Sequence, residues 1–344
     1  MNTMMKDKSA SVNRGSFIYM LFLLLGFVLL LLCAAASISF GAARINIVTA
    51  WEAVFAFDPA LTEHQIIQSA RIPRTIADVM VGVSLAIAGA IMQGTTRNAL
   101  ADSGLMGVNS GAAFAVALAF AFLPGSSHTQ MLLIGFAGAG LGAGTTYLAA
   151  ALNRRGMTPE RLVLAGISIT MLFSALGTFV SMKFNIGKAL VYWTSGSVAG
   201  ASWEELLFVF PWFVAGVVLA LCLSPSIAIL SLGDDIAVSV GQRTKLVKLL
   251  SLLAVLLLAG LSTSLVGPVS FVGLIVPHMM RFIVGIDYRR IVPASAIYGG
   301  VFMLLADVTG RILARPNELA LGIIFAIIGV PFFLFISRRE KRAF

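Results

Sequence analysis

Long, nearly uninterrupted apolar runs recur along this 344-residue chain, and they restrict its fold more than any other feature. The run from Ile76 to Met92, for example, contains one charged residue, Asp78. A helix needs about 20 apolar residues to cross the ~30 Å hydrocarbon core of a bilayer. Lipid permits only helices and closed barrels as spanning structures, and these runs lack the short alternating pattern of barrel strands. We therefore predict an all-α polytopic membrane protein.

Composition agrees with a membrane protein, because 59% of the residues are hydrophobic and 11% are charged, against about a quarter charged in soluble domains. We assign the net charge of +9 to basic loops facing the cytoplasm rather than to nucleic-acid binding. Cys33 and Cys222 both lie in apolar runs, so we expect neither a disulfide framework nor a metal site.

Ten segments are predicted to cross the membrane. They cover residues 17–40, 76–92, 108–122, 131–152, 162–181, 206–223, 249–265, 269–283, 291–313 and 319–336. The first segment could also be a signal peptide, but it exceeds the usual apolar core of about 7–15 residues, and we expect an uncleaved helix. Ten crossings place both termini on one side. If that side is cytoplasmic, it holds 17 of the 24 Lys and Arg residues, which sets the orientation.

Two further patterns concern packing and the membrane surface. Gly138 with Gly142, and Gly140 with Gly144, have the four-residue spacing that lets helices approach closely, and we interpret all four as packing residues. Residues 183–205 carry aromatic side chains and are predicted to form an interfacial helix with a loop.

Ionisable residues inside the membrane are the usual candidates for function, and few exist here. Asp78 follows Arg74 by four residues, and Asp307 precedes Arg311 by four, so we expect local ion pairs near the helix ends. His278 follows Pro277, and we expect it to have a structural role.

The sequence lacks the clustered metal-ligand, nucleophile-elbow and phosphate-loop motifs, so we predict no catalysis and no nucleotide hydrolysis by this chain. Irregular backbone at membrane depth is tolerated only where it is buried or lines a cavity. The polar, glycine-containing break at residues 97–104 therefore favours a transporter or a channel.

The polar stretch at residues 230–242 contains a short predicted helix. Asp234 and Asp235 suit its N-terminus, and Gly241 can end it. Its apolar surface, with Ala237, Val238 and Val240, is too small to span a membrane. Such a helix docks on a partner protein or lies on the membrane surface.

Seven motifs occur in a characteristic order, including RIPRT at 71–75, NALADSGLMGVNSGA from Asn98, LSLGDDIAVSVG at 230–241, FVGLIVPHMMR ending at Arg281, LLADVTGR at 304–311 and ELALG at 318–322. Together with GAIMQ ending at Gln93, they closely resemble the FecCD/BtuC-type permease family of binding-protein-dependent ABC importers for ferric siderophores and vitamin B12. The resemblance extends from Ile66 to Ile336 and implies the ten-helix fold of type II importer permeases.

The resemblance also implies roles for residues at both ends of the protein. Arg71, Arg74 and Arg311 match arginines that pair with glutamates of the extracytoplasmic binding protein. The segment at 230–241 is similar to the helix that couples the permease to its ATPase, and its implied coupling residues are Leu232, Gly233, Asp234, Asp235, Ala237 and Gly241. The implied cytoplasmic gate consists of Asn98, Ala99, Leu100 and Thr158.

Three positions depart from the family pattern. Ala99, Ser103 and Ala320 stand where the family usually has proline. These departures affect the assignment of the gate more than that of the fold.

We therefore expect residues 1–344 to form one permease domain, with cytoplasmic segments at 1–16, 224–248 and 337–344. The implied function is import of iron(III)–siderophore complexes across the cytoplasmic membrane. Hydroxamate siderophores are one candidate type. A vitamin B12 or haem permease is the alternative, and an ion-coupled secondary transporter is a remote one. The implied partners are a second permease, identical or homologous, two ATPase subunits that bind ATP and Mg²⁺, and a siderophore-binding protein. We expect no cofactor or metal on this chain itself.

Overall fold

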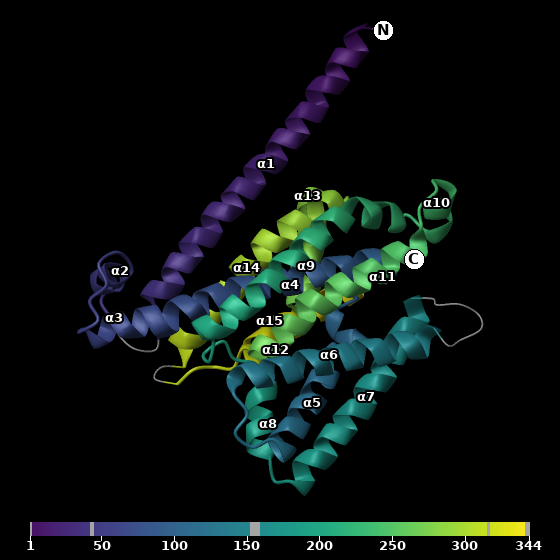
Figure 1. Cartoon of the computed structure of the whole chain (residues 1–344). Coiled ribbons are helices and arrows are strands. Elements are labelled where there is room, and N and C mark those ends of the chain that lie inside the picture. Colours follow the sequence, from purple (N-terminus) through teal and green to yellow (C-terminus); the bar gives the residue numbers. More distant parts are fainter. Residues whose placement is uncertain (1, 42–44, 152–158, 315–316, 341–344) are drawn as a thin grey trace.

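The computed structural model describes residues 2–41, 45–151, 159–314 and 317–340, and within these ranges every regular element is a helix (Figure 1). The first half contains α1 (Asn2–Ser39), α2 (Ile47–Phe55), α3 (Thr62–Ile66), α4 (Ile72–Thr96), α5 (Val108–Phe122), α6 (His128–Ala151) and α7 (Pro159–Lys183). The second half contains α8 (Gly187–Thr194), α9 (Trp203–Leu230), α10 (Asp234–Ser239), α11 (Thr244–Val255), α12 (Leu261–Val266), α13 (Val272–Val284), α14 (Tyr288–Leu313) and α15 (Leu321–Glu340). A π-helical segment, Leu256–Gly260, joins α11 to α12 in one continuous helix.

The predicted membrane-spanning architecture is confirmed. Seven helical stretches in the described ranges are long and apolar enough to cross a bilayer, and three shorter apolar helices, α5, α13 and α15, take the remaining predicted positions. The prediction for residues 108–122 matches α5 at both ends. Helix α13 has 13 residues, which at 1.5 Å per residue is about 20 Å, shorter than the ~30 Å hydrocarbon core of a bilayer.

Helix α4 is the centre of the bundle. It packs against α14, α13, α9 and α11, and most of its residues are buried. Glycines make this possible because the backbones touch at two crossings: Gly82 meets Gly299 of α14, and Gly89 meets Gly273 of α13. A side chain at either crossing would collide with the backbone of the neighbouring helix.

Helices α5, α6 and α7 form a second packed group beside this centre. Gly138 and Gly142 of α6 lie directly on the α5 side, against Gly111 and Gly107, so their predicted packing role is confirmed. Among the described residues of this chain, no atom lies near enough to contact a Cβ at Gly140 or Gly144, so this second pair does not pack against another helix of the chain there. The two glycine pairs, offset by two residues along α6, therefore lie on opposite faces of the helix.

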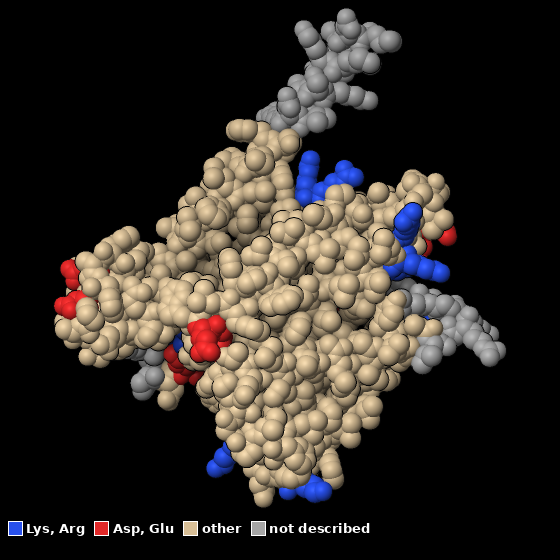
Figure 2. Space-filling view, in the orientation of Figure 1, with Lys and Arg blue, Asp and Glu red and all other residues tan. Residues whose placement is uncertain are grey.

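The bundle has two distinct ends. The end containing Arg71, Arg74 and Arg311, with α2 and α3 beside it, is called here the arginine end; the opposite one is the α10 end (Figure 1). Figure 2 shows a broad band free of charged side chains between them on the visible face. Acidic side chains gather where α2 and α3 lie, both basic and acidic ones lie near α10, and further basic ones lie at the bottom of the view. This distribution is the one expected when a hydrocarbon layer surrounds the middle of the bundle.

Candidate functional site

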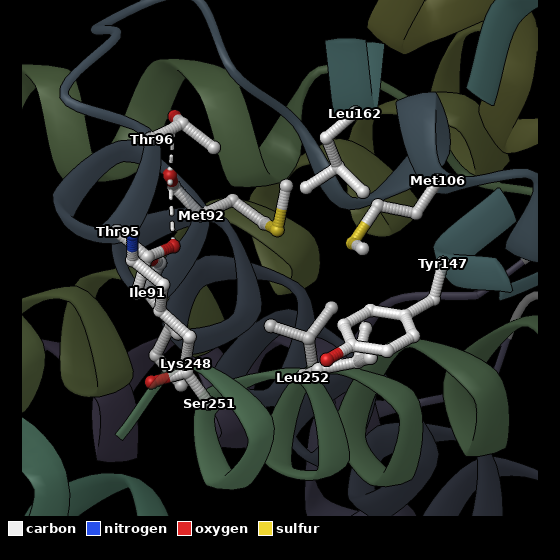
Figure 3. A pocket seen from close by; sticks show the side chains of 11 residues that line it. Ile91, Met92, Thr95, Thr96, Met106, Tyr147, Leu162, Lys248, Ser251 and Leu252 are labelled. Carbon is white, nitrogen blue, oxygen red and sulfur yellow. Dashed lines mark hydrogen bonds between the residues drawn. The ribbon is translucent and has the colours of Figure 1, made fainter. Parts of the chain in front are cut away.

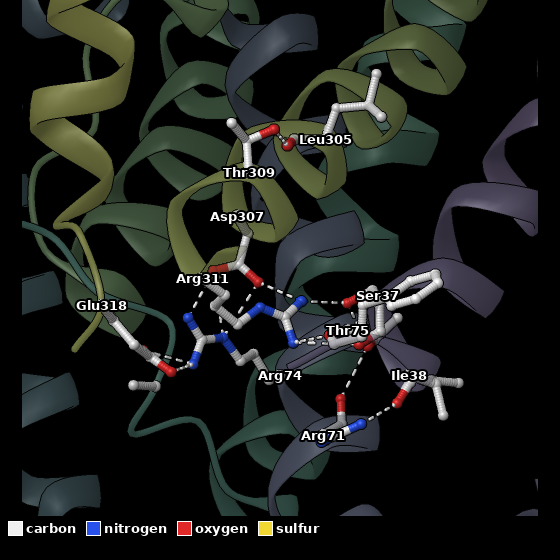
Figure 4. Close-up of polar contacts among 12 residues, drawn as sticks. Ser37, Ile38, Arg71, Arg74, Thr75, Leu305, Asp307, Thr309, Arg311 and Glu318 are labelled. Carbon is white, nitrogen blue, oxygen red and sulfur yellow. Dashed lines mark hydrogen bonds and ion pairs between the residues drawn. The ribbon is translucent and has the colours of Figure 1, made fainter. Parts of the chain in front are cut away.

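The arginine end contains a buried network of ion pairs that joins α4 to α14 and to the connection before α15 (Figure 4). Arg74 Nη2 lies 2.6 Å from Asp307 Oδ1, and Arg74 Nη1 donates to both oxygens of Glu318 at 2.9 and 2.8 Å. When one guanidinium donates two hydrogen bonds to a carboxylate, the pair is stabilised and the relative orientation of the two side chains is fixed. Arg74 is thus clamped between two acids that follow it by more than 230 residues.

Arg311 completes this network and attaches it to α1. Its Nη2 atom lies 2.7 Å from Asp307 Oδ2 and 2.7 Å from Ser37 Oγ, and its Nη1 donates to the Ser37 and Phe40 carbonyls at 3.1 Å. The expected ion pair between Asp307 and Arg311 is therefore confirmed. Arg71 Nη1 donates to the next two carbonyls, those of Ile38 and Ser39, at 2.8 and 3.0 Å. Two arginines thus satisfy carbonyls that the end of a helix leaves open.

The expected pair between Asp78 and Arg74 is wrong. Asp78 is completely buried beside Asp307, and within the described part of the chain it forms no ion pair with Arg74. The four-residue spacing permits the pair, but Arg74 extends toward α14, where Asp307 and Glu318 hold all of its nitrogen atoms.

Accessibility separates the three arginines for which docking is predicted. Arg71 is 5% exposed and Arg311 is 2% exposed, whereas the Arg74 side chain is 11% exposed and its partner Glu318 is 31% exposed. The docking role of the three residues stays a prediction. Of the three arginines, Arg74 lies nearest to the surface, because its partner Glu318 is exposed to solvent.

At the α10 end, the predicted short helix is confirmed as α10, which begins at Asp234 after Gly233 with φ +131°. Ala237 is fully buried and packs with Leu230 and Val247, so it supports α10 from beneath. Of the predicted coupling set, Leu232, Asp235 and Gly241 are exposed at this surface, and three further exposed apolar residues there, Ile236, Val238 and Val240, were not included in the set. Leu232 and these three apolar residues are 48–63% exposed. Ile236, Val238 and Val240 can be recognised in the sequence as apolar residues of a short polar-flanked helix, but the burial of Ala237 between them follows from its contacts with Leu230 and Val247.

The predicted gate loop follows α4, which ends at Arg97 in a left-handed conformation. The Asn98 side chain accepts the Leu100 N–H at 2.9 Å, a turn that forms here although Ala99 replaces the usual proline. Ser103 donates its N–H to Asp102 Oδ1 at 2.9 Å, a bond that a proline there could not form. Thr158 lies outside the described residues.

A small cavity of about 60 Å³ lies beside this loop, between the ends of α4 and α11 and the start of α7. The sulfur atoms of Met92 and Met106 face into it, opposite Tyr147 and Leu252 (Figure 3). Thr95 and Leu162 line it as well, so the two segments that carry the predicted gate border one apolar space. Methionine fills irregular spaces and adapts when neighbouring helices shift.

The predicted interfacial helix is present as α8, and Tyr192 and Trp193 line a cavity of about 420 Å³ between α8, α6 and the end of α12. His278 is buried and packs edge-on against Phe282 and Phe332, as a structural histidine does. In the described ranges, no three His, Cys, Asp or Glu residues are grouped closely enough to bind a metal ion.

The long apolar helices and the two charged ends define a polytopic membrane protein. The FecCD transport family model matches residues 29–339, and the chain belongs to this family.

Among curated proteins, the chain is 46% identical over 320 residues to the iron(3+)-hydroxamate import permease FhuB of Bacillus subtilis, covering 93% of this chain and 83% of that protein. It is 40% identical to the Bacillus subtilis iron-uptake permease FeuB, covering 88% and 91%, and 36% identical to the Escherichia coli ferric enterobactin permease FepD, covering 91% and 94%. Among solved structures, a metal-chelate-type ABC transporter in an inward-facing conformation matches with a TM-score of 0.80 and 28% identity, covering 93% of this chain and 99% of that one.

Proposed function

We propose that this chain is the transmembrane permease subunit of an ABC importer that carries iron(III)–siderophore complexes across the cytoplasmic membrane. Its membership of the FecCD transport family and its 46% identity to FhuB support this proposal. FhuB is named for iron(3+)-hydroxamate import, which favours a hydroxamate-type substrate for this chain.

The observation that carries the proposal is the exposed apolar face of α10. A helix of six residues that exposes Ile236 and Val238 to solvent is far too short to span a bilayer and needs a covering surface. We assign that surface to a separate ATPase subunit, present in two copies, which binds ATP and Mg²⁺. The permease itself binds no cofactor in this scheme.

The proposed orientation places the α10 end and both termini in the cytoplasm and the arginine end outside. The extracytoplasmic binding protein docks at the arginine end. Helix α7 exposes large apolar side chains along its length, with Met171 at 68% and Met182 at 75%. A second permease, identical or homologous, covers part of this face, and the substrate pathway lies between the two chains.

A vitamin B12 or haem substrate is the alternative within this class, and the same fold serves it equally well. The presence of α10 disfavours an ion-coupled secondary transporter, because that mechanism needs no helix that contacts an ATPase. Such a transporter is also disfavoured by the position of Asp78 and Asp307 at the arginine end rather than at the middle of the membrane.

Uptake in a strain that lacks this gene tests the proposal. Radioactive iron is supplied on a hydroxamate and on a catecholate siderophore, with labelled cobalamin in parallel. Loss of hydroxamate-bound iron uptake, restored by the gene on a plasmid, is the expected result. Loss of cobalamin uptake with normal iron uptake would replace the proposed substrate with the alternative.

A further inference from the structure

Glu318 is the exposed partner in an otherwise buried network. Arg74 donates through Nη1 to Glu318 and through Nε and Nη2 to Asp307, whose side chain is 2% exposed. Glu318 itself is 31% exposed and lies in the short connection between α14 and α15. Glu318, which is itself exposed to solvent, therefore covers one side of the Arg74 guanidinium.

The two halves of this clamp differ greatly in strength. Removing one partner of a buried pair such as Asp307 leaves an uncompensated charge and is strongly destabilising. An exposed pair contributes little. A carboxylate arriving from solvent can thus replace Glu318 at Arg74 Nη1, while Asp307 continues to hold the other nitrogen atoms.

We propose that Glu318 occupies, within the chain, the place that a carboxylate of the docking protein takes on Arg74, so that docking exchanges one acid for the other. This inference rests on the proposed function, because it requires an extracytoplasmic protein at the arginine end. It restricts the direct contact to Arg74, since Arg71 and Arg311 are buried against the end of α1. Glu318 then weakens docking and discriminates against surfaces that lack a well-placed acid.

The release of Glu318 does not require α15 to unfold. The start of α15 is held separately, because the N–H groups of Leu321 and Gly322 donate to the Gly196 and Ser195 carbonyls at 3.2 and 3.3 Å. A Glu318→Gln variant is therefore expected to fold, and it removes the negative charge while keeping the size of the side chain.

The test measures the affinity of the complete transporter, reconstituted in lipid nanodiscs, for its fluorescently labelled binding protein at low salt. Glu318→Gln is expected to tighten binding about fivefold, the scale of one partly exposed ion pair. Glu204→Gln is the matched control: it removes an exposed acid at the same end, which accepts a hydrogen bond from Thr129 at 3.3 Å. This control is expected to leave the affinity unchanged.

Arg74→Gln is expected to weaken binding, and adding Glu318→Gln to it is expected to have no further effect. Unchanged or weaker binding by Glu318→Gln, with normal binding by the wild type, overturns the exchange and leaves the proposed function standing. Equal tightening by Glu204→Gln also overturns it, because general charge would then be the cause. Absence of binding by the wild-type transporter overturns the proposed partnership, and this inference with it.

Discussion

Lys248 on α11 lies 2.7 Å from Asp234 at the first turn of α10, and this ion pair ties the short helix to the continuous 23-residue helix Thr244–Val266, which begins with α11. The two side chains are 24% and 44% exposed, so the pair contributes little to folding. Its importance lies in the orientation of α10. The packing of Ala237 on Val247 is a second contact between α10 and α11. Under the proposed function, we expect a movement of α10 to be passed to α11 through these two contacts.

Lys248→Met is expected to reduce transport about two- to fivefold, on the scale of one exposed ion pair. The thermal unfolding midpoint is expected to stay within a few degrees of the wild type. Uptake by the reconstituted complex and its ATPase rate check this prediction. The exchanged pair Asp234→Lys with Lys248→Asp should recover only part of the activity, because lysine is unfavourable at the N-terminus of a helix. Full activity in the single variant would mean that the ion pair has no part in coupling.

Ala237 and Val238 are neighbours with opposite environments, and their variants are expected to fail in different ways. Ala237→Leu places a large side chain in a fully buried position and is expected to destabilise the protein by about 1–3 kcal/mol. Val238→Ser alters a side chain that is 60% exposed and is expected to leave folding intact. The ATPase should nevertheless lose its stimulation by loaded binding protein in Val238→Ser. Size-exclusion profiles and ATPase assays on both variants separate the two outcomes.

Asp307→Asn is expected to be the most damaging single change at the arginine end. It removes the charge shared by Arg74 and Arg311 and leaves two buried cations poorly compensated, at a cost of about 3–5 kcal/mol. The measurement is the thermal unfolding midpoint in detergent. Thr309→Ala, which removes only a hydroxyl bonded to the Leu305 carbonyl on the same helix, is the control. A midpoint equal to that of this control would show that the network carries no stability.

Gly142→Ala and Gly140→Ala form a matched pair on α6. The first places a methyl group against the backbone of Gly107 and is expected to destabilise the protein by about 1–3 kcal/mol. The second points into open space and is expected to be neutral or to stabilise the helix by up to about 1 kcal/mol. Thermal midpoints of the two purified variants give the comparison. Equal effects would contradict the packing assigned to α5 and α6.

Local features were predictable from the sequence, and distant pairings were not. The limits of α5, the short helix α10 and the pair Asp307–Arg311 follow from composition and spacing within a few residues. The spacing of Asp78 and Arg74 indicated a pair in the same way, yet Asp307 and Glu318, far away in the sequence, hold that arginine. Helical periodicity shows which residues share a face, but it does not show which other helix that face meets. The buried position of Ala237 depends on the same missing information.

The C-terminal end of α1 is held by arginines that are synthesised later than α1 itself. The carbonyl groups that end α1 are bonded by Arg71 and by Arg311, and Arg311 follows Ser37 by 274 residues. While the chain is being synthesised, α1 enters the membrane with these groups open, and they stay hydrated at the bilayer surface until α4 and then α14 have been inserted. The end of α1 is therefore fully bonded only after α14, more than 270 residues later, has joined the bundle.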